Sequence, residues 1–248
     1  MDNRQLLDTS WHIRADSNIL KPNLEIIMGS EEGKPFVYDF GKMPHLFISG
    51  VDGVGKTSYV VNLILELMTQ NSPENIQFLI YTSKGYEYTH FNYSPFMLED
   101  LLTELNSVQD ALETIVELIK DRFSKVVKHK TSLSDSDVFF VMDDASFITK
   151  YDWANNLLLK IIQDGRVAKI HLILVTSNPH GSDIPPRIRD GIPCRIAFHT
   201  TTAAASRIII GRAGAEKLIA PGELIFNSYN RFVKLKTTGF SFDGIRES

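Results

Sequence analysis

The sequence has little cysteine, no long apolar run and no surplus of positive charge. Its single cysteine, Cys194, cannot form an intramolecular disulfide, which favours a reducing compartment. No stretch reaches the roughly 18 consecutive apolar residues of a membrane-spanning helix. The first residues lack the basic-then-apolar order of a secretion signal. We therefore expect a cytoplasmic protein, or the cytoplasmic domain of a membrane-associated one.

The net charge excludes a protein that binds nucleic acid through its overall charge, and the histidine spacing excludes a histidine metal site. The chain carries 26 Lys and Arg against 30 Asp and Glu, a formal net charge of −4, so any DNA contact would need a local basic surface. The seven histidines lack the spacing of a metal site. The 248 residues suit one α/β domain with modest extensions, without repeats or low-complexity tracts.

Apolar segments alternate with helical periodicity along most of the chain. Two segments, 24–29 and 36–40, predict a small N-terminal β extension joined by a glycine turn. The longest helical pattern runs from Leu101 to Val126. Five apolar segments predict buried strands, namely 45–49, 76–82, 138–144, 170–177 and 194–200. This order predicts an α/β fold with a mainly parallel sheet and helices on both faces.

The segment GVDGVGKT, residues 50–57, matches a phosphate-binding loop, with a predicted strand before it and a predicted helix after it. Its three glycines would let backbone N–H groups point at phosphate oxygens, beside the positive end of the helix. Lys56 would reach the β- and γ-phosphates of ATP, and Thr57 would ligate Mg²⁺. A chance glycine turn is the alternative, which this context disfavours. The predicted nucleotide-binding residues are Gly50, Val51, Asp52, Gly53, Val54, Gly55, Lys56, Thr57 and Ser58.

Two acids follow the apolar segment VFFVM. Asp143 is predicted to hold magnesium, and Asp144 stands where many related ATPases have a glutamate that activates the attacking water. A simple loop cap is the alternative for the pair. Asp144 is one methylene shorter than glutamate, and misplacement by about 1 Å can cost on the order of 100-fold in rate. The substitution therefore puts turnover in doubt, but not binding.

These motifs and several further blocks resemble the FtsK and SpoIIIE motor domains over roughly residues 23–239. On that basis, residues 1–22 are interpreted as an N-terminal arm and residues 240–248 as a C-terminal tail. The remaining matching positions are Met43, Pro44, His45, Lys84, Glu87, Arg166, His171, Thr176, Pro179, Ile192, Pro193, Arg195, Ile196, Ala197, Phe198, Ser206, Arg207, Gly214, Ala215 and Glu216.

The resemblance implies a RecA-like P-loop ATPase that forms a ring, usually a hexamer, and pulls double-stranded DNA through its pore. It implies that Arg207 reaches the nucleotide of a neighbouring subunit, a role worth about 10³ to 10⁵ in rate in other NTPases. It also implies sensing roles for Thr176 and Ser177. Arg187 and Arg189, expected in a loop, would contact the translocated polymer, with a subunit interface or solvent as alternatives.

The chain also departs from the family pattern. Besides Asp144, Ser177 replaces a glutamine, Asn178 an arginine and Gly211 an acid. These differences favour, as an alternative, an ATPase module of a type VII protein-secretion or conjugative coupling system, with weak turnover and a protein substrate. A third hypothesis is a structural module that binds ATP without hydrolysing it. Whether the chain is a whole protein or part of a longer, membrane-anchored one stays open.

Overall fold

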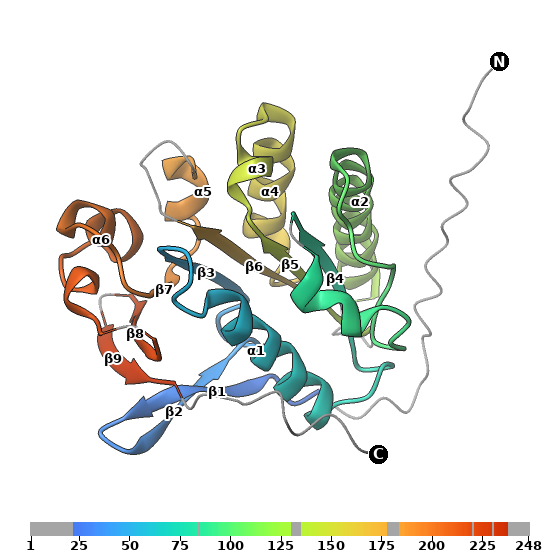
Figure 1. Cartoon of the computed structure of the whole chain (residues 1–248). Coiled ribbons are helices and arrows are strands. Elements are labelled where there is room, and N and C mark those ends of the chain that lie inside the picture. Colours follow the sequence, from blue (N-terminus) through green and yellow to red (C-terminus); the bar gives the residue numbers. More distant parts are fainter. Residues whose placement is uncertain are drawn as a thin grey trace.

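The computed structural model of the chain describes residues 22–83, 85–129, 135–177, 184–219, 221–229 and 231–237. These residues form one nine-stranded sheet with the strand order β2-β1-β9-β8-β7-β3-β6-β5-β4, and helices cover both of its faces (Figure 1). The predicted α/β fold with a largely parallel core is confirmed. Among the described helices, none combines the length and apolar character needed to cross a bilayer.

The parallel part of the sheet has the order β7-β3-β6-β5-β4. Its strands are β3 (His45–Gly50), β4 (Ile76–Thr82), β5 (Asp137–Asp143), β6 (Ile170–Ser177) and β7 (Cys194–Ala197). Nearly all side chains of β3 to β6 are buried, because helices cover both faces, and this explains their continuous apolar sequences. Two predicted bounds were wrong: β5 ends before Asp144, and β7 ends at Ala197 rather than at residue 200.

The other side of the sheet is antiparallel. The predicted N-terminal pair is present as β1 (Glu25–Glu31) and β2 (Lys34–Asp39). The sequence analysis missed a C-terminal hairpin, β8 (Glu223–Ser228) and β9 (Arg231–Lys236), which joins β1 to β7. Its strands are half-buried and rich in polar residues, so they lack the apolar runs that identified the others. The β extension is therefore built from both ends of the described chain.

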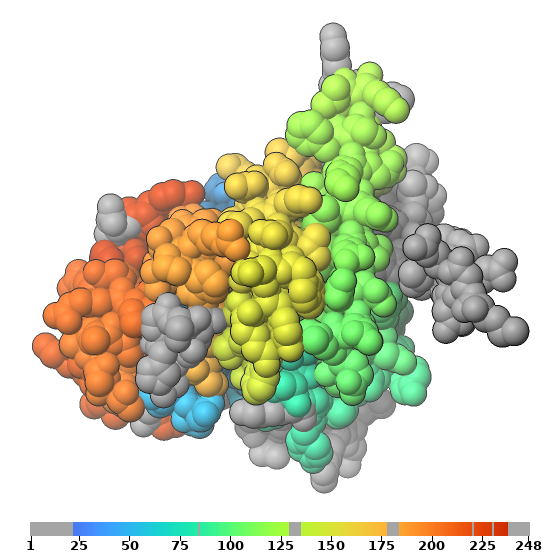
Figure 2. All heavy atoms as spheres, turned by 90° about the horizontal axis from the view of Figure 1, so that it is seen from above, coloured from blue at the N-terminus to red at the C-terminus, as the bar shows by residue number. Residues whose placement is uncertain are grey.

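Two apolar cores lie on opposite faces of the sheet. Helix α1 (Lys56–Gln70) packs on one face, in contact with the β1-β2 hairpin. On the other face, α2 (Leu105–His129), α4 (Asp152–Asp164) and α5 (Pro186–Asp190) lie side by side (Figures 1 and 2). The short helices α3 (Ser146–Thr149) and α6 (Ala203–Ile210) complete that face, and the 3-10 helices are η1 (Tyr86–Phe91) and η2 (Ala215–Lys217).

Two further local predictions were wrong. The long helix begins at Leu105, because the preceding chain runs beside β4 as an extra extended segment, with a bridge from Leu102 to Tyr81. Arg187 and Arg189 lie in helix α5 rather than in a loop, since Pro186 favours the first helical turn. Several predictions fall outside the described residues: the arm up to residue 21, the tail from residue 240, and the assignments of Lys84, Asn178 and Pro179.

Candidate functional site

The glycine loop lies between β3 and α1, as predicted. Gly53 and Gly55 have φ angles of 77° and 92°, which favour glycine, and Lys56 begins α1. Gly50 leaves room for a close approach of the chain, because a Cβ there would lie 2.7 Å from the Phe198 Cβ. The close approach lets the loop dock on the chain after β7, with a hydrogen bond from the Val51 N–H to the His199 carbonyl at 2.9 Å. The loop is therefore held against β7 at its base.

Lys56 is held inside the loop. Its side chain is buried, and its ammonium group donates to the Val51 carbonyl at 2.7 Å. It also lies 3.9 Å from the carboxylate of the exposed Asp52. A cation fixed at this point favours anions over the loop.

Asp143 ends β5 opposite the start of α1. Its Oδ2 accepts hydrogen bonds from the Thr57 hydroxyl at 2.8 Å and from the Tyr88 hydroxyl at 3.1 Å. Burial raises the pKa of Asp143 and the neighbouring Asp144 adds to this, whereas the two hydrogen bonds and the charge of Lys56 oppose it. The carboxylate therefore gains from any additional cation that binds beside it.

Asp144 is the first residue after β5, and its backbone has a left-handed φ of 66°. Only 8% of the residue is exposed, and its Oδ2 accepts a hydrogen bond from the Ser83 hydroxyl at 2.5 Å. A positive φ is uncommon outside glycine and persists where the surroundings enforce it. The carboxylate is thus held in one arrangement rather than exposed on a free loop.

The loop and the two acids line one pocket of about 260 Å³, here named the loop pocket. Glu87 and Ser177 also line it. The Thr57 hydroxyl and the Asp143 carboxylate are the hard oxygen donors that Mg²⁺ takes, and Mg²⁺ usually adds substrate phosphates and waters to one or two carboxylates. The residues therefore fit the predicted magnesium. The described residues contain no group of three or more His, Cys, Asp or Glu that could hold a metal ion.

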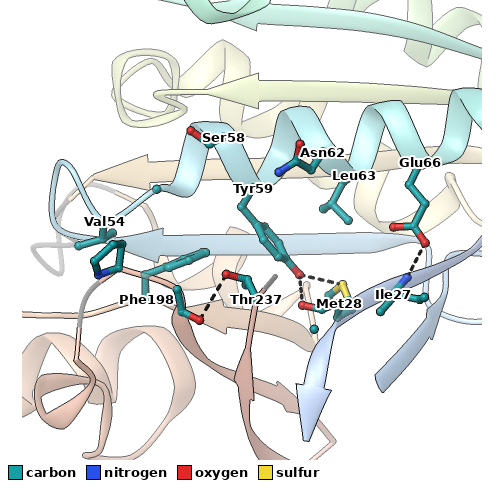
Figure 3. A pocket seen from close by; sticks show the side chains of 14 residues that line it. Ile27, Met28, Val54, Ser58, Tyr59, Asn62, Leu63, Glu66, Phe198 and Thr237 are labelled. Atoms are coloured by element: carbon teal, nitrogen blue, oxygen red, sulfur yellow. Dashed lines mark hydrogen bonds between the residues drawn. The ribbon is translucent and has the colours of Figure 1, made fainter. Parts of the chain in front are cut away.

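A second pocket of about 370 Å³, here named the side pocket, lies along α1 (Figure 3). It shares Gly55 and Ser58 with the loop pocket. Tyr59 extends from α1 and donates to the Met28 carbonyl at 3.0 Å, and its ring meets that of Phe198 edge-on at 5.4 Å. Farther along α1, Glu66 accepts from the Ile27 N–H at 2.8 Å. These contacts join α1 to β1 and make one wall of the pocket from the β extension.

The two predicted sensor residues differ in position. Ser177, at the end of β6, lines the loop pocket, whereas Thr176 does not. Thr176 is fully buried, and its hydroxyl has no hydrogen-bond partner within the described part of the chain. The structure therefore brings Ser177, but not Thr176, to the acids.

Arg207 is exposed on α6 and lines neither pocket. The adjacent Ser206 is fully buried, accepting from the Ala215 N–H at 3.1 Å and donating to the Arg212 carbonyl at 2.7 Å. Glu216 accepts from the Gly214 N–H at 2.7 Å, which lowers the pKa of Glu216, and Arg207 is among the weaker causes. The matched motif residues thus form one unit that presents Arg207 at the surface.

The two arginines predicted to contact a polymer differ in how exposed their side chains are. Arg187 is exposed on α5. The Arg189 side chain is only 15% exposed, and its Nε lies 3.5 Å from the Asp190 carboxylate. Asp190 also lies 3.3 Å from Arg195, whose guanidinium donates to the carbonyls of three residues, Ile192, Ile209 and Arg189. Arg187 is therefore the more accessible cation.

Sequence reasoning missed Ser83, Tyr88 and the walls of the side pocket. Ser83 and Tyr88 flank the matched Lys84 and Glu87, so that segment was the available signal. Each contacts an acid 61 or 55 residues away along the chain, a distance that no local pattern encodes.

Comparison with known proteins agrees with this architecture. A model of the FtsK/SpoIIIE family matches residues 14–220. The DNA translocase FtsK of Corynebacterium efficiens is 28% identical over 221 residues, which cover 79% of this chain and 23% of that protein. The DNA translocase FtsK of Helicobacter pylori is 26% identical over 233 residues, covering 87% and 28%. The chain thus spans about a quarter of the length of these curated relatives.

Two solved structures share the fold. The pCW3 conjugation coupling protein TcpA, in its monomer form with ATPγS, has a TM-score of 0.80 at 17% identity, covering 92% of this chain and 69% of that chain. The cytoplasmic domain of the Thermomonospora curvata type VII secretion ATPase EccC has a TM-score of 0.75 at 21% identity, covering 98% and 31%. Because the family model matches most of the sequence described here, the chain belongs to the FtsK/SpoIIIE family.

Proposed function

We propose that this chain is a motor domain that binds ATP with Mg²⁺ and assembles as a ring, with a hexamer as the expected form. The ring couples ATP hydrolysis to the movement of double-stranded DNA. The observation that carries the proposal is the loop pocket, where Lys56, Thr57, Asp143 and Asp144 converge. Family membership and two matched relatives named DNA translocases support the choice of polymer.

ATP occupies both pockets in this proposal. Its phosphates lie in the loop pocket, under the backbone N–H groups of the loop and beside the Lys56 ammonium. Its adenosine lies in the side pocket, which offers the apolar surfaces of Tyr59, Leu63 and Phe198 with a few polar groups such as Asn62 and Thr237. The lining residues common to both pockets support a single ligand that extends through them.

Thr57 and Asp143 hold Mg²⁺ in this proposal, and the ion supplies charge that neutralises the phosphate oxygens. Asp144 acts as the general base toward the attacking water, because it lines the same pocket and its carboxylate is held in place. Arg207 is exposed and lines neither pocket of its own subunit. In this proposal it therefore acts on the nucleotide of a neighbouring subunit.

An ATPase module for protein secretion or conjugative coupling is the second candidate. The likeness to EccC and TcpA and the aspartate at position 144 favour it. ATP hydrolysis measured with and without plasmid DNA, at concentrations where light scattering detects assembly, separates the two. We expect DNA to stimulate the rate and Lys56→Ala to abolish it. An assembled ring that hydrolyses ATP but neither binds DNA nor responds to it would favour the secretion candidate.

A further inference from the structure

We propose that Ser83 is the positioning residue that makes Asp144 a competent base despite its short side chain; this inference rests on the proposed ATP hydrolysis. Ser83 directly follows β4, and Asp144 directly follows β5. The two strands are parallel neighbours in which Thr82 is paired with Asp143. Ser83 and Asp144 are thus the next residues at the same edge of the sheet, and their side chains meet there at 2.5 Å.

The hydrogen bond selects which carboxylate oxygen serves the pocket. The Ser83 hydroxyl donates to Oδ2, and Asp144 lines the loop pocket whereas Ser83 does not. Because Oδ2 already accepts from Ser83, we assign the proton transfer from water to Oδ1. A carboxylate that rotates freely would spend part of its time with neither oxygen aligned, so the bond preorganises the base.

The backbone at Asp144 supports this geometry. Its φ of 66° is kept by the hydrogen bond from the Ala145 N–H to the Val175 carbonyl of β6, at 2.8 Å. The Phe147 N–H donates to the Asp144 carbonyl at 3.0 Å. Backbone and side chain are therefore fixed by different elements, β6 and the end of β4. This is the arrangement expected where a side chain must have one orientation.

The same segment of chain orients both acids. Ser83 donates to Asp144, and Tyr88, five residues later, donates to Asp143. Tyr88 is fully buried and has a packing role, whereas Ser83 is exposed, so its hydroxyl is not needed to fill the core. Removal of that hydroxyl thus affects the orientation of Asp144 with little effect on folding.

The hydrolytic step shows where the orientation matters. A water proton passes to the Asp144 carboxylate while the water oxygen bonds to the γ-phosphorus. The bond from that phosphorus to the β–γ bridging oxygen breaks, and ADP leaves with the electron pair. Loss of one hydrogen bond to an ionised group costs about 10-fold in rate when the bond orients a reacting side chain.

Steady-state ATP hydrolysis by the assembled protein tests the inference. We expect Ser83→Ala to lower kcat about 10-fold with KM changed by less than about twofold, and Ser83→Thr to restore most of the rate because threonine keeps the hydroxyl. In the Asp144→Glu background, Ser83→Ala should change kcat by less than about twofold, since the longer side chain reaches past the serine. Ser124→Ala, which removes a serine hydroxyl from α2, is the matched control and should keep the wild-type rate.

Four results would overturn the inference. An unchanged kcat in Ser83→Ala would show that the bond is dispensable, and a higher kcat would show that Ser83 restrains the base. An equal loss in the Asp144→Glu background would show that Ser83 acts independently of the length of the acid. If the assembled wild-type protein hydrolyses ATP no faster than the reaction without protein, the proposed ATP hydrolysis is overturned and this inference with it. The wild-type rate alone therefore distinguishes the two failures.

Discussion

Replacing Asp143 by asparagine should stabilise the nucleotide-free protein while removing its response to ATP and Mg²⁺. Only 7% of Asp143 is exposed, and burial raises its pKa above the ordinary value of 3.8. A raised pKa means that the folded protein holds the ionised form less well than the unfolded chain does. The stability from this group is complete below pH 3.8 and is lost as pH rises through the folded pKa, so at neutral pH the charge destabilises.

The two effects have opposite signs. Asparagine keeps the size of the side chain and an oxygen that accepts from Thr57 and Tyr88, but it carries no charge. We expect the nucleotide-free melting temperature to rise, by about 2–4 °C for each 1 kcal/mol gained in a domain of this size. ATP with Mg²⁺ at 100 times its dissociation constant should stabilise the wild type by about 2.7 kcal/mol, or about 5–10 °C.

Thermal melts of both proteins, with no nucleotide, with ATP and EDTA, and with ATP and Mg²⁺, measure these shifts. The order of stability should reverse: Asp143→Asn should melt higher without nucleotide and lower with ATP and Mg²⁺. Asp164→Asn, at the exposed end of α4, is the control and should follow the wild type throughout. A lower nucleotide-free melting temperature would contradict the electrostatic argument, and an undiminished Mg²⁺-dependent shift would refute the role of Asp143 as a magnesium ligand.

Three further predictions concern stability, turnover and DNA. Burial, with His171 nearby, lowers the pKa of His45 from 6.5 to about 3, so the stability that it contributes is complete above pH 6.5 and is lost as pH falls toward 3, by about 1.4 kcal/mol per pH unit. His45→Asn keeps an acceptor for the Leu172 N–H and should flatten the loss of stability between pH 7 and pH 5 in urea unfolding; an unchanged slope would contradict this. Under conditions of assembly, Asp144→Glu should raise the ATPase rate, and Arg207→Ala should cancel the gain without weakening ATP binding; brisk hydrolysis by a demonstrated monomer would rule out a site shared between subunits. Arg187→Glu should weaken DNA binding and its dependence on salt in fluorescence titrations, while Arg189→Glu should have the smaller effect because Asp190 already lies beside it; equal effects would count against the accessibility argument.

The local pattern alone predicted the five parallel strands and the phosphate-binding loop. Strands covered on both faces are apolar at nearly every position, as in β4 and β5, so the run of consecutive apolar residues itself indicates their burial. The loop is equally local, because its glycines, Lys56 and Thr57 lie within one short segment between a strand and a helix. The hairpin β8-β9 lacked such a signal, since its half-buried strands carry polar residues.

Only the tertiary structure decided which side chains meet these motifs. The order β6-β5-β4 brings the ends of three strands to one edge, and there Ser83 meets Asp144 and Ser177 faces the loop pocket. Thr57 meets Asp143 across 86 residues for the same reason, since strand pairing rather than spacing sets the distance. The side pocket likewise needs Met28 from β1, Phe198 after β7 and Thr237 after β9 around one face of α1. Parallel pairing of distant strands has no local sequence signal, because it depends on which buried surfaces pack together once the chain is folded.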